Sequence, residues 1–226
     1  SLRRLLDDAR TRSERSWPLW LQRLSLLQRP TKETAAFGLA ELERATSRDA
    51  VGASSAVVGA LSHGLARSEP TLARQFEERL QQGFGQADAS ARAAWTLALG
   101  NTRSPRVLPQ LEVAANDADP RVRTTAAWAL GSLEDGSTQT TLSRLCLDLD
   151  PRVREAAIHA LAQGPFSLPV AAAAIAASPD GRADAAWVNL LAPHLAEPGV
   201  REVLVQLLAR TTEPSLAGRL RTLLEG

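Results

Sequence analysis

Apolar residues recur at helical spacing in the middle of the chain. Over residues 119–133 the spacing of three and four residues places them on one face of a helix. These residues are Val122, Ala126, Ala129, Leu130 and Leu133. The polar segment 134–137 interrupts the pattern, and a second helix is expected over residues 138–147. The apolar face of this second helix is expected to hold Leu142, Leu145, Cys146 and Leu149.

The rest of the chain follows the same pattern less regularly, and no stretch alternates as a β-strand would. All predicted elements are therefore helices, joined by short turns rich in Pro, Gly and polar residues. Besides the two above, we expect helices over residues 2–16, 18–28, 32–45, 49–66, 70–83, 87–100, 105–115, 150–163, 168–177, 182–194, 200–210 and 215–224.

A repeat of 31 residues underlies the central helices. "DPRVR" begins at Asp119 and again at Asp150, and the looser "DASAR" begins 31 residues earlier, at Asp88. A fourth, weaker copy begins at Asp180. In each clear copy Asp is expected to cap a helix, and Pro suits the first helical position because no partner for its missing N–H is needed there.

A helix pair cannot bury its apolar faces alone, so successive pairs must stack on one another. The sequence therefore predicts an all-α fold, an α-solenoid of stacked antiparallel helix pairs that forms a single domain over residues 1–226. Residues 88–163 are its regular repeats. Residues 1–87 are degenerate N-terminal helices, and residues 164–226 are degenerate C-terminal repeats with a cap.

The stretches "DPRVRTTAAWALGSL" and "DPRVREAAIHALAQG" resemble the short HEAT-like repeats of the phycobilisome-lyase type. The resemblance covers residues 88–163, about a third of the chain, and it implies a right-handed HEAT-like superhelix without implying one activity. A shorter stretch, "LALGNTRSPRVLPQLEVA" from Leu97, is similar to the helical domain of vitellogenin-type lipid-transfer proteins.

Charge is unevenly distributed along the chain. The whole chain carries +1, whereas residues 1–32 hold eight basic and three acidic side chains, a net charge of +5, so the remainder carries −4. No apolar run approaches the roughly 18–20 residues of a membrane helix. The chain begins at Ser and holds no Met. We expect it to be a fragment or a processed form, and its localisation stays open.

Residues that carry catalytic chemistry are sparse. His63, His159 and His194 lie far apart, and Cys146 falls on a core face. The pattern therefore predicts no catalytic residue, no metal site and no cofactor.

Arg92, Arg123 and Arg154 occupy equivalent repeat positions. One interpretation is a basic ladder for phosphates or acidic partners. The favoured one is structural, with each Arg bonded to a loop carbonyl or a capping Asp of the neighbouring repeat.

Two sets of residues are candidates for binding a partner. Trp128 lies about 150° from the centre of its core stripe. With Leu97 and His159 it forms either an exposed row or a partly buried one. Arg106, Gln110 and Arg144 lie on the second helices among acidic residues, so they do not form a phosphate track.

Trp17 and Trp20 are expected to pack as a terminal cap or to dock on a membrane or partner.

We therefore predict a non-catalytic platform for protein–protein interaction, with a protein as its partner. One alternative is the helical domain of a lipid-transfer or lipoprotein-like protein, which would bring lipid or membrane contact. The second is a nucleic-acid-binding protein or a lyase/glycosylase-type HEAT enzyme, which the mixed charge of the second helices disfavours.

Overall fold

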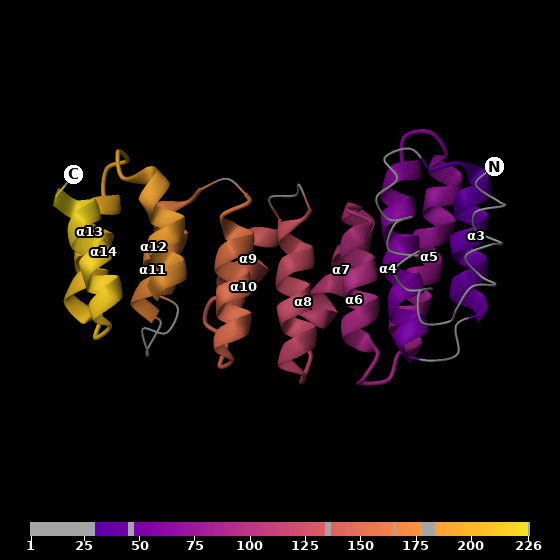
Figure 1. The fold of residues 1–226 in the computed structure, drawn as a ribbon, viewed down its shortest axis with the longest axis horizontal. Helices are drawn as coiled ribbons and strands as arrows, with labels where there is room; N and C mark the ends of the chain where they lie inside the picture. Colours follow the sequence, from indigo (N-terminus) through magenta and orange to yellow (C-terminus); the bar gives the residue numbers. More distant parts are fainter. Residues whose placement is uncertain (1–29, 45–47, 134–136, 165, 178–183, 226) are drawn as a thin grey trace. The chain divides into compact units, whose positions relative to one another are not determined.

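The computed structural model describes residues 30–44, 48–133, 137–164, 166–177 and 184–225, and every regular element within these ranges is a helix (Figure 1). The fold is an α-solenoid of helix pairs, as predicted. The helices expected over residues 2–16 and 18–28, with Trp17 and Trp20, lie outside the described residues. The chain divides into two compact units, Ser1–Leu133 (unit 1) and Glu134–Gly226 (unit 2). The division falls inside the regular repeats.

Unit 1 is a double layer of helices. One layer holds α4 (Arg48–Leu65), α6 (Arg92–Asn101) and α8 (Pro120–Gly131), where α4 packs on α6 and α6 on α8. The other holds α5 (Pro70–Gln86), the 3-10 turn η1 (Pro105–Val107) and α7 (Leu108–Ala114). Helix α3 (Lys32–Arg44) packs against α4. The core between the layers includes Leu61, Phe76, Leu80, Leu99, Leu111 and Leu130.

The first-layer helices of unit 1 approach closely because small residues face each other. A Cβ added to Gly59 would lie 2.1 Å from the carbonyl oxygen of Ala98, and one added to Gly100 would lie 2.6 Å from Cβ of Ala129. Asn101 reinforces the first contact, since its Nδ2 donates to the carbonyl of Ala56 at 3.2 Å. Backbone contact therefore sets the spacing of α4, α6 and α8.

Unit 2 continues the pairwise arrangement. Helix α9 (Thr138–Leu145) packs on α10 (Pro151–Leu161), and α10 packs on α12 (Asp184–Leu191). Helix α11 (Leu168–Ala177) contacts α9 and α12. The turn η2 (Ala192–His194) follows α12, and α13 (Val200–Arg210) and α14 (Pro214–Glu225) pack on each other. Its core includes Leu142, Leu145, Ile158, Trp187, Leu191 and Leu204.

The predicted helix caps are present. Asp119 accepts a bond from the Arg121 N–H at 2.8 Å, and Asp150 accepts one from the Arg152 N–H at 2.9 Å. Pro follows each cap at the first helical position. At Asp88, where no Pro follows, the side chain instead closes a turn with the N–H groups of Ser90 and Ala91. Helix α6 therefore begins at Arg92, five residues later than predicted.

One predicted core residue is wrongly placed. Leu149 is 96% exposed, although the apolar residues before it, Leu142, Leu145 and Cys146, are buried as expected. The reason is that α9 ends at Leu145, so the helical spacing no longer governs the loop that leads to Asp150. The core residues predicted for 119–133 are all buried.

Candidate functional site

Two large apolar side chains in unit 1 are exposed at equivalent repeat positions. Leu97 on α6 and Trp128 on α8 are each 48% exposed, and their helices are adjacent. By contrast, the other two tryptophans of the described chain, Trp95 and Trp187, are buried. A half-exposed Trp beside an exposed Leu is typical of a surface that buries itself against a partner.

Leu97 also lines an open groove of about 460 Å³. Its lining comes from α4, the turn before α6, α6 itself and the start of α8, and consists of Gly52, Ala53, Ser90, Ala93, Ala94, Leu97, Asp119 and Arg121. Half of these residues are Gly or Ala, because α4 and α6 approach closely here, with Gly52 against Ala94. The small residues leave room for an apolar side chain beside Leu97.

The charges at the end of the groove neutralise each other. Arg121 donates from Nε and Nη2 to the carboxylate of Asp119, at 3.1 and 2.8 Å. This bond lowers the pKa of Asp119, which therefore stays ionised at neutral pH. The groove consequently offers a largely apolar surface with a paired charge at its rim.

The arginines of the repeat column bind the chain itself. Arg92 donates to the carboxylate of Asp117 from Nε at 2.5 Å and from Nη2 at 3.1 Å. Arg123 donates from Nη1 to the main-chain carbonyl of Asp117 at 2.8 Å, and Arg154 donates to that of Asp148 at 2.7 Å. The structural interpretation is confirmed for Arg123 and Arg154, which bond loop carbonyls of the preceding repeat, whereas Arg92 bonds a loop carboxylate of its own repeat.

Asp117 links two helices through these bonds, and its ionisation matters for stability. The hydrogen bond from Arg92 lowers the pKa of Asp117. A lowered folded-state pKa adds stability above the unfolded value of about 3.9, and this stability is lost as the pH falls through the folded-state pKa. Asp117→Asn should therefore lower the melting temperature by a few degrees at pH 7, and the difference from wild type should shrink below about pH 4.

Thermal unfolding of both proteins at pH 7 and pH 3 tests this, with Glu112→Gln as the matched control. Glu112 is exposed on α7, so its substitution should change little at either pH. A difference for Asp117→Asn that is equally large at both pH values would show that charge is not the cause.

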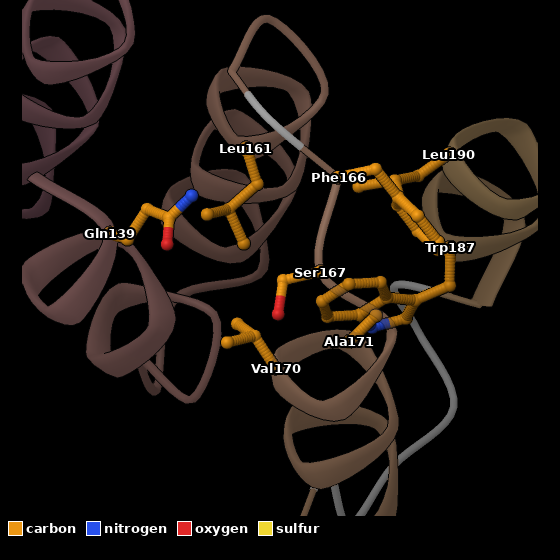
Figure 2. Close-up of a pocket in the computed structure, with 8 residues that line it drawn as sticks. All are labelled: Gln139, Leu161, Phe166, Ser167, Val170, Ala171, Trp187 and Leu190. Carbon is orange, nitrogen blue, oxygen red and sulfur yellow. The ribbon is translucent and has the colours of Figure 1, made fainter. Parts of the chain in front are cut away.

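Unit 2 contains a much smaller cavity, of about 10 Å³. Figure 2 shows its lining: Gln139, Leu161, Phe166, Ser167, Val170, Ala171, Trp187 and Leu190. The Phe166 ring stacks on His194 with 3.8 Å between ring centroids, which fixes that wall. A volume of this size holds about one water molecule. The cavity is therefore too small for an organic cofactor.

The described residues hold little that resembles a catalytic centre. Within them no group of three His, Cys, Asp or Glu side chains is placed to hold a metal ion. Cys146 is fully buried, as predicted, and burial raises the pKa of its thiol to about 12, which suppresses the reactive thiolate. None of the helices in these ranges is long and apolar enough to cross a membrane.

Comparison with known proteins identifies the repeats. Residues 77–162 match the family model described as HEAT repeats. This part of the chain consists of HEAT-like repeats. A chain in the solved structure of the Pds5–Scc1 complex is similar in fold, with a TM-score of 0.48 and 14% identity over 96% of the HEAT-like chain. The HEAT-like chain spans 37% of the length of that solved chain, and no curated protein matches it.

The predicted binding residues of this HEAT-like protein are spread over several elements. Leu97 and Trp128 lie on adjacent helices of unit 1. Arg106 is exposed in η1, and Gln110, half-buried, lies one turn further along on α7. In unit 2, Arg144 is exposed on α9 and His159 is half-buried on α10. A role in binding stays a prediction for all six.

Sequence reasoning missed two features of the HEAT-like surface. The first is the contribution of Gly52 and Ala53 to the groove, because the 31-residue repeat does not extend to α4. The second is the exposed pair Leu147 and Leu149, at 45% and 96%. Here the repeat gives a usable signal, since Leu147 aligns with Asn116 and Leu149 with Ala118. A large apolar residue that replaces a polar or small one in the repeat register indicates a non-core position.

Proposed function

We propose that this HEAT-like chain binds a protein partner without chemistry on it, and that the contact includes Leu97, Trp128 and the adjoining groove, together the Leu97–Trp128 surface. The observation that carries the proposal is the equal 48% exposure of these two large side chains on adjacent helices, one of which, Leu97, lines an open groove rich in Gly and Ala. Burial of such side chains against a partner supplies most of the energy at protein interfaces.

The groove suggests how a partner engages. A Leu or aromatic side chain of the partner would enter the groove over Ala93 and Ala94 and pack against Leu97. The indole of Trp128 would then cover the apolar contact from the neighbouring helix, as a Trp often does at the centre of an interface. Rigid helices hold both side chains, so little order has to be gained on binding.

Nucleic acid receives less support as a partner. The exposed arginines at the helix starts, Arg121 and Arg152, are bonded to Asp119 and Asp150. Affinity for nucleic acid depends on cations that can replace the counterions of phosphates. Arginines that already neutralise a carboxylate contribute less to the affinity for nucleic acid.

Trp128→Ala should weaken partner binding at least tenfold, or about 1.4 kcal/mol, because it removes the largest exposed apolar side chain of the surface. The measurement is photo-crosslinking in cells that encode the chain, with a photo-reactive amino acid in place of Leu97. This variant should form a discrete covalent adduct with a protein partner. The adduct should disappear when the variant also carries Trp128→Ala.

The matched control places the same photo-reactive residue at Val205, which is 51% exposed on α13. This position should give no comparable adduct. An adduct of equal strength at both positions, or one indifferent to Trp128→Ala, would exclude the Leu97–Trp128 surface as the contact. Circular dichroism of each variant checks that the helices are retained.

A further inference from the structure

Three helical segments begin with the same arrangement of residues. Ser104, Asp119 and Asp150 each stand in extended backbone before Pro, Arg and Val. In each case the cap side chain accepts a bond from the N–H of that Arg. The Val is fully buried in all three copies. The side chains of the three arginines therefore begin in equivalent backbone settings; these residues are Arg106, Arg121 and Arg152.

Two of these arginines bind the carboxylate of their own cap. Arg121 bonds Asp119 through Nε and Nη2, and Arg152 bonds Asp150 in the same way, with Nε at 3.2 Å and Nη2 at 2.9 Å. The bond lowers the pKa of Asp150 to about 2. The local geometry of this helix start thus suits a bidentate bond between guanidinium and carboxylate.

In the third copy the carboxylate is missing. The cap is Ser104, and no Asp or Glu of the described chain forms an ion pair with the exposed Arg106. Arg103, three residues earlier, is also exposed and forms no ion pair there. The sequence has no acidic residue between Asp88 and Glu112. Two unneutralised guanidinium groups therefore share one turn.

This turn is held in place by hydrogen bonds. Gln81 on α5 donates from Nε2 to the carbonyl of Arg106 at 3.1 Å, and Thr102 donates from Oγ1 to the carbonyl of Leu99 at 2.7 Å. Arg103 itself adopts a left-handed backbone, with φ 49°, where Gly or Asn is more common. A fixed backbone limits the order that the two side chains must gain on binding an anion.

We infer that the turn Thr102–Val107 is an acceptor site for a carboxylate from an acidic segment of a protein partner. Arg106 binds the carboxylate in the place that the cap Asp occupies in the other two copies, and Arg103 adds a second positive charge. The ligand is a carboxylate rather than a phosphate, because the same arginine in the same local setting binds Asp twice within this chain. The site goes beyond the Leu97–Trp128 surface and does not depend on it.

The test uses a capped hexaglutamate peptide and the arginine Nε–H resonances of the full chain, measured by ¹⁵N NMR at low salt. The Arg106 resonance, identified by its loss in Arg106→Gln, should shift saturably. The Arg121 and Arg152 resonances should shift much less, because their guanidinium groups are already bonded. Capped hexaglutamine should leave all three unchanged.

Two cap variants make the test decisive. Ser104→Asp supplies the missing carboxylate from within, so the response of Arg106 to hexaglutamate should be lost. Ser104→Asn is an uncharged cap of the same shape and should retain the response. Shifts no larger at Arg106 than at Arg121, an unchanged response in Ser104→Asp, or a stronger response to inorganic phosphate at matched ionic strength would each overturn the assignment. Adducts at Leu97 report on the other surface, so the two proposals can fail separately.

Discussion

Replacing Trp95 by alanine should lower the free energy of unfolding by about 3–5 kcal/mol, whereas the same replacement at Trp128 should cost less than about 1 kcal/mol. Trp95 is 7% exposed, and its ring packs so closely on α5 that a Cβ added to Gly83 would lie 2.3 Å from it. Removal of this ring leaves a cavity that rigid helices cannot close. Trp128 is 48% exposed, so far fewer of its contacts are lost.

Urea unfolding followed by circular dichroism measures both values. Trp95→Phe is the matched control, and its smaller cavity should cost less than Trp95→Ala. The two tryptophans lie in unit 1 and follow the same "AA" dipeptide, so local sequence does not distinguish them. Equal losses for Trp95→Ala and Trp128→Ala would mean that Trp128 is a core residue and would remove the basis of the proposed surface.

Gly59→Ala should destabilise the chain by about 3 kcal/mol, at the upper end of what overpacking costs. The added methyl group would lie 2.1 Å from the Ala98 carbonyl oxygen, which is backbone and cannot rotate away. Helices α4 and α6 would have to separate, and the bond from Asn101 to Ala56 would lengthen.

Gly85→Ala on α5 is the matched control in the same unit. A Cβ at Gly85 would meet nothing within 4 Å, so the substitution should stabilise the helix by about 0.5–1 kcal/mol. The free energy of unfolding should fall for Gly59→Ala and rise for Gly85→Ala in the same urea experiment. This difference in sign separates the effect of the contact between α4 and α6 from the effect of helix propensity. Stabilisation by both substitutions would show that α4 and α6 are not in backbone contact.

The regular repeats allowed the fold to be predicted in detail. Where a cap, a Pro and an apolar stripe agree, as at Asp119 and Asp150, the helix starts and the buried residues follow from the sequence. Helix α13 matches its predicted bounds to the residue, and α11 begins at the predicted residue, because Pro or Gly marks their starts. Prediction was worse where one signal was missing, as at Asp88, which no Pro follows and whose side chain closes a turn before α6 begins.

The candidate surface was only partly accessible to sequence reasoning. The angular position of Trp128 indicated that it lies off the core stripe, and its exposure of 48% in the structure agrees. The groove beside Leu97 could not be predicted, because it depends on how α4 and α6 pack. The unpaired state of Arg106 was also missed, since "SPRV" opens a second helix of a pair and is not aligned with "DPRV" by the 31-residue shift.

Asp117 accepts hydrogen bonds from several residues at once. Its carboxylate holds Arg92 of α6 and the N–H of Asp119, while its carbonyl holds Arg123 of α8. Residues that share one partner are energetically coupled, so the loss of one hydrogen bond changes the free energy that the others contribute to folding. Loss of α6 from the folded unit would therefore remove support from α8. One residue of a loop thus couples the repeat that holds α6 to the next repeat, which holds α8, and this is the nearest-neighbour coupling from which such folds derive their cooperativity.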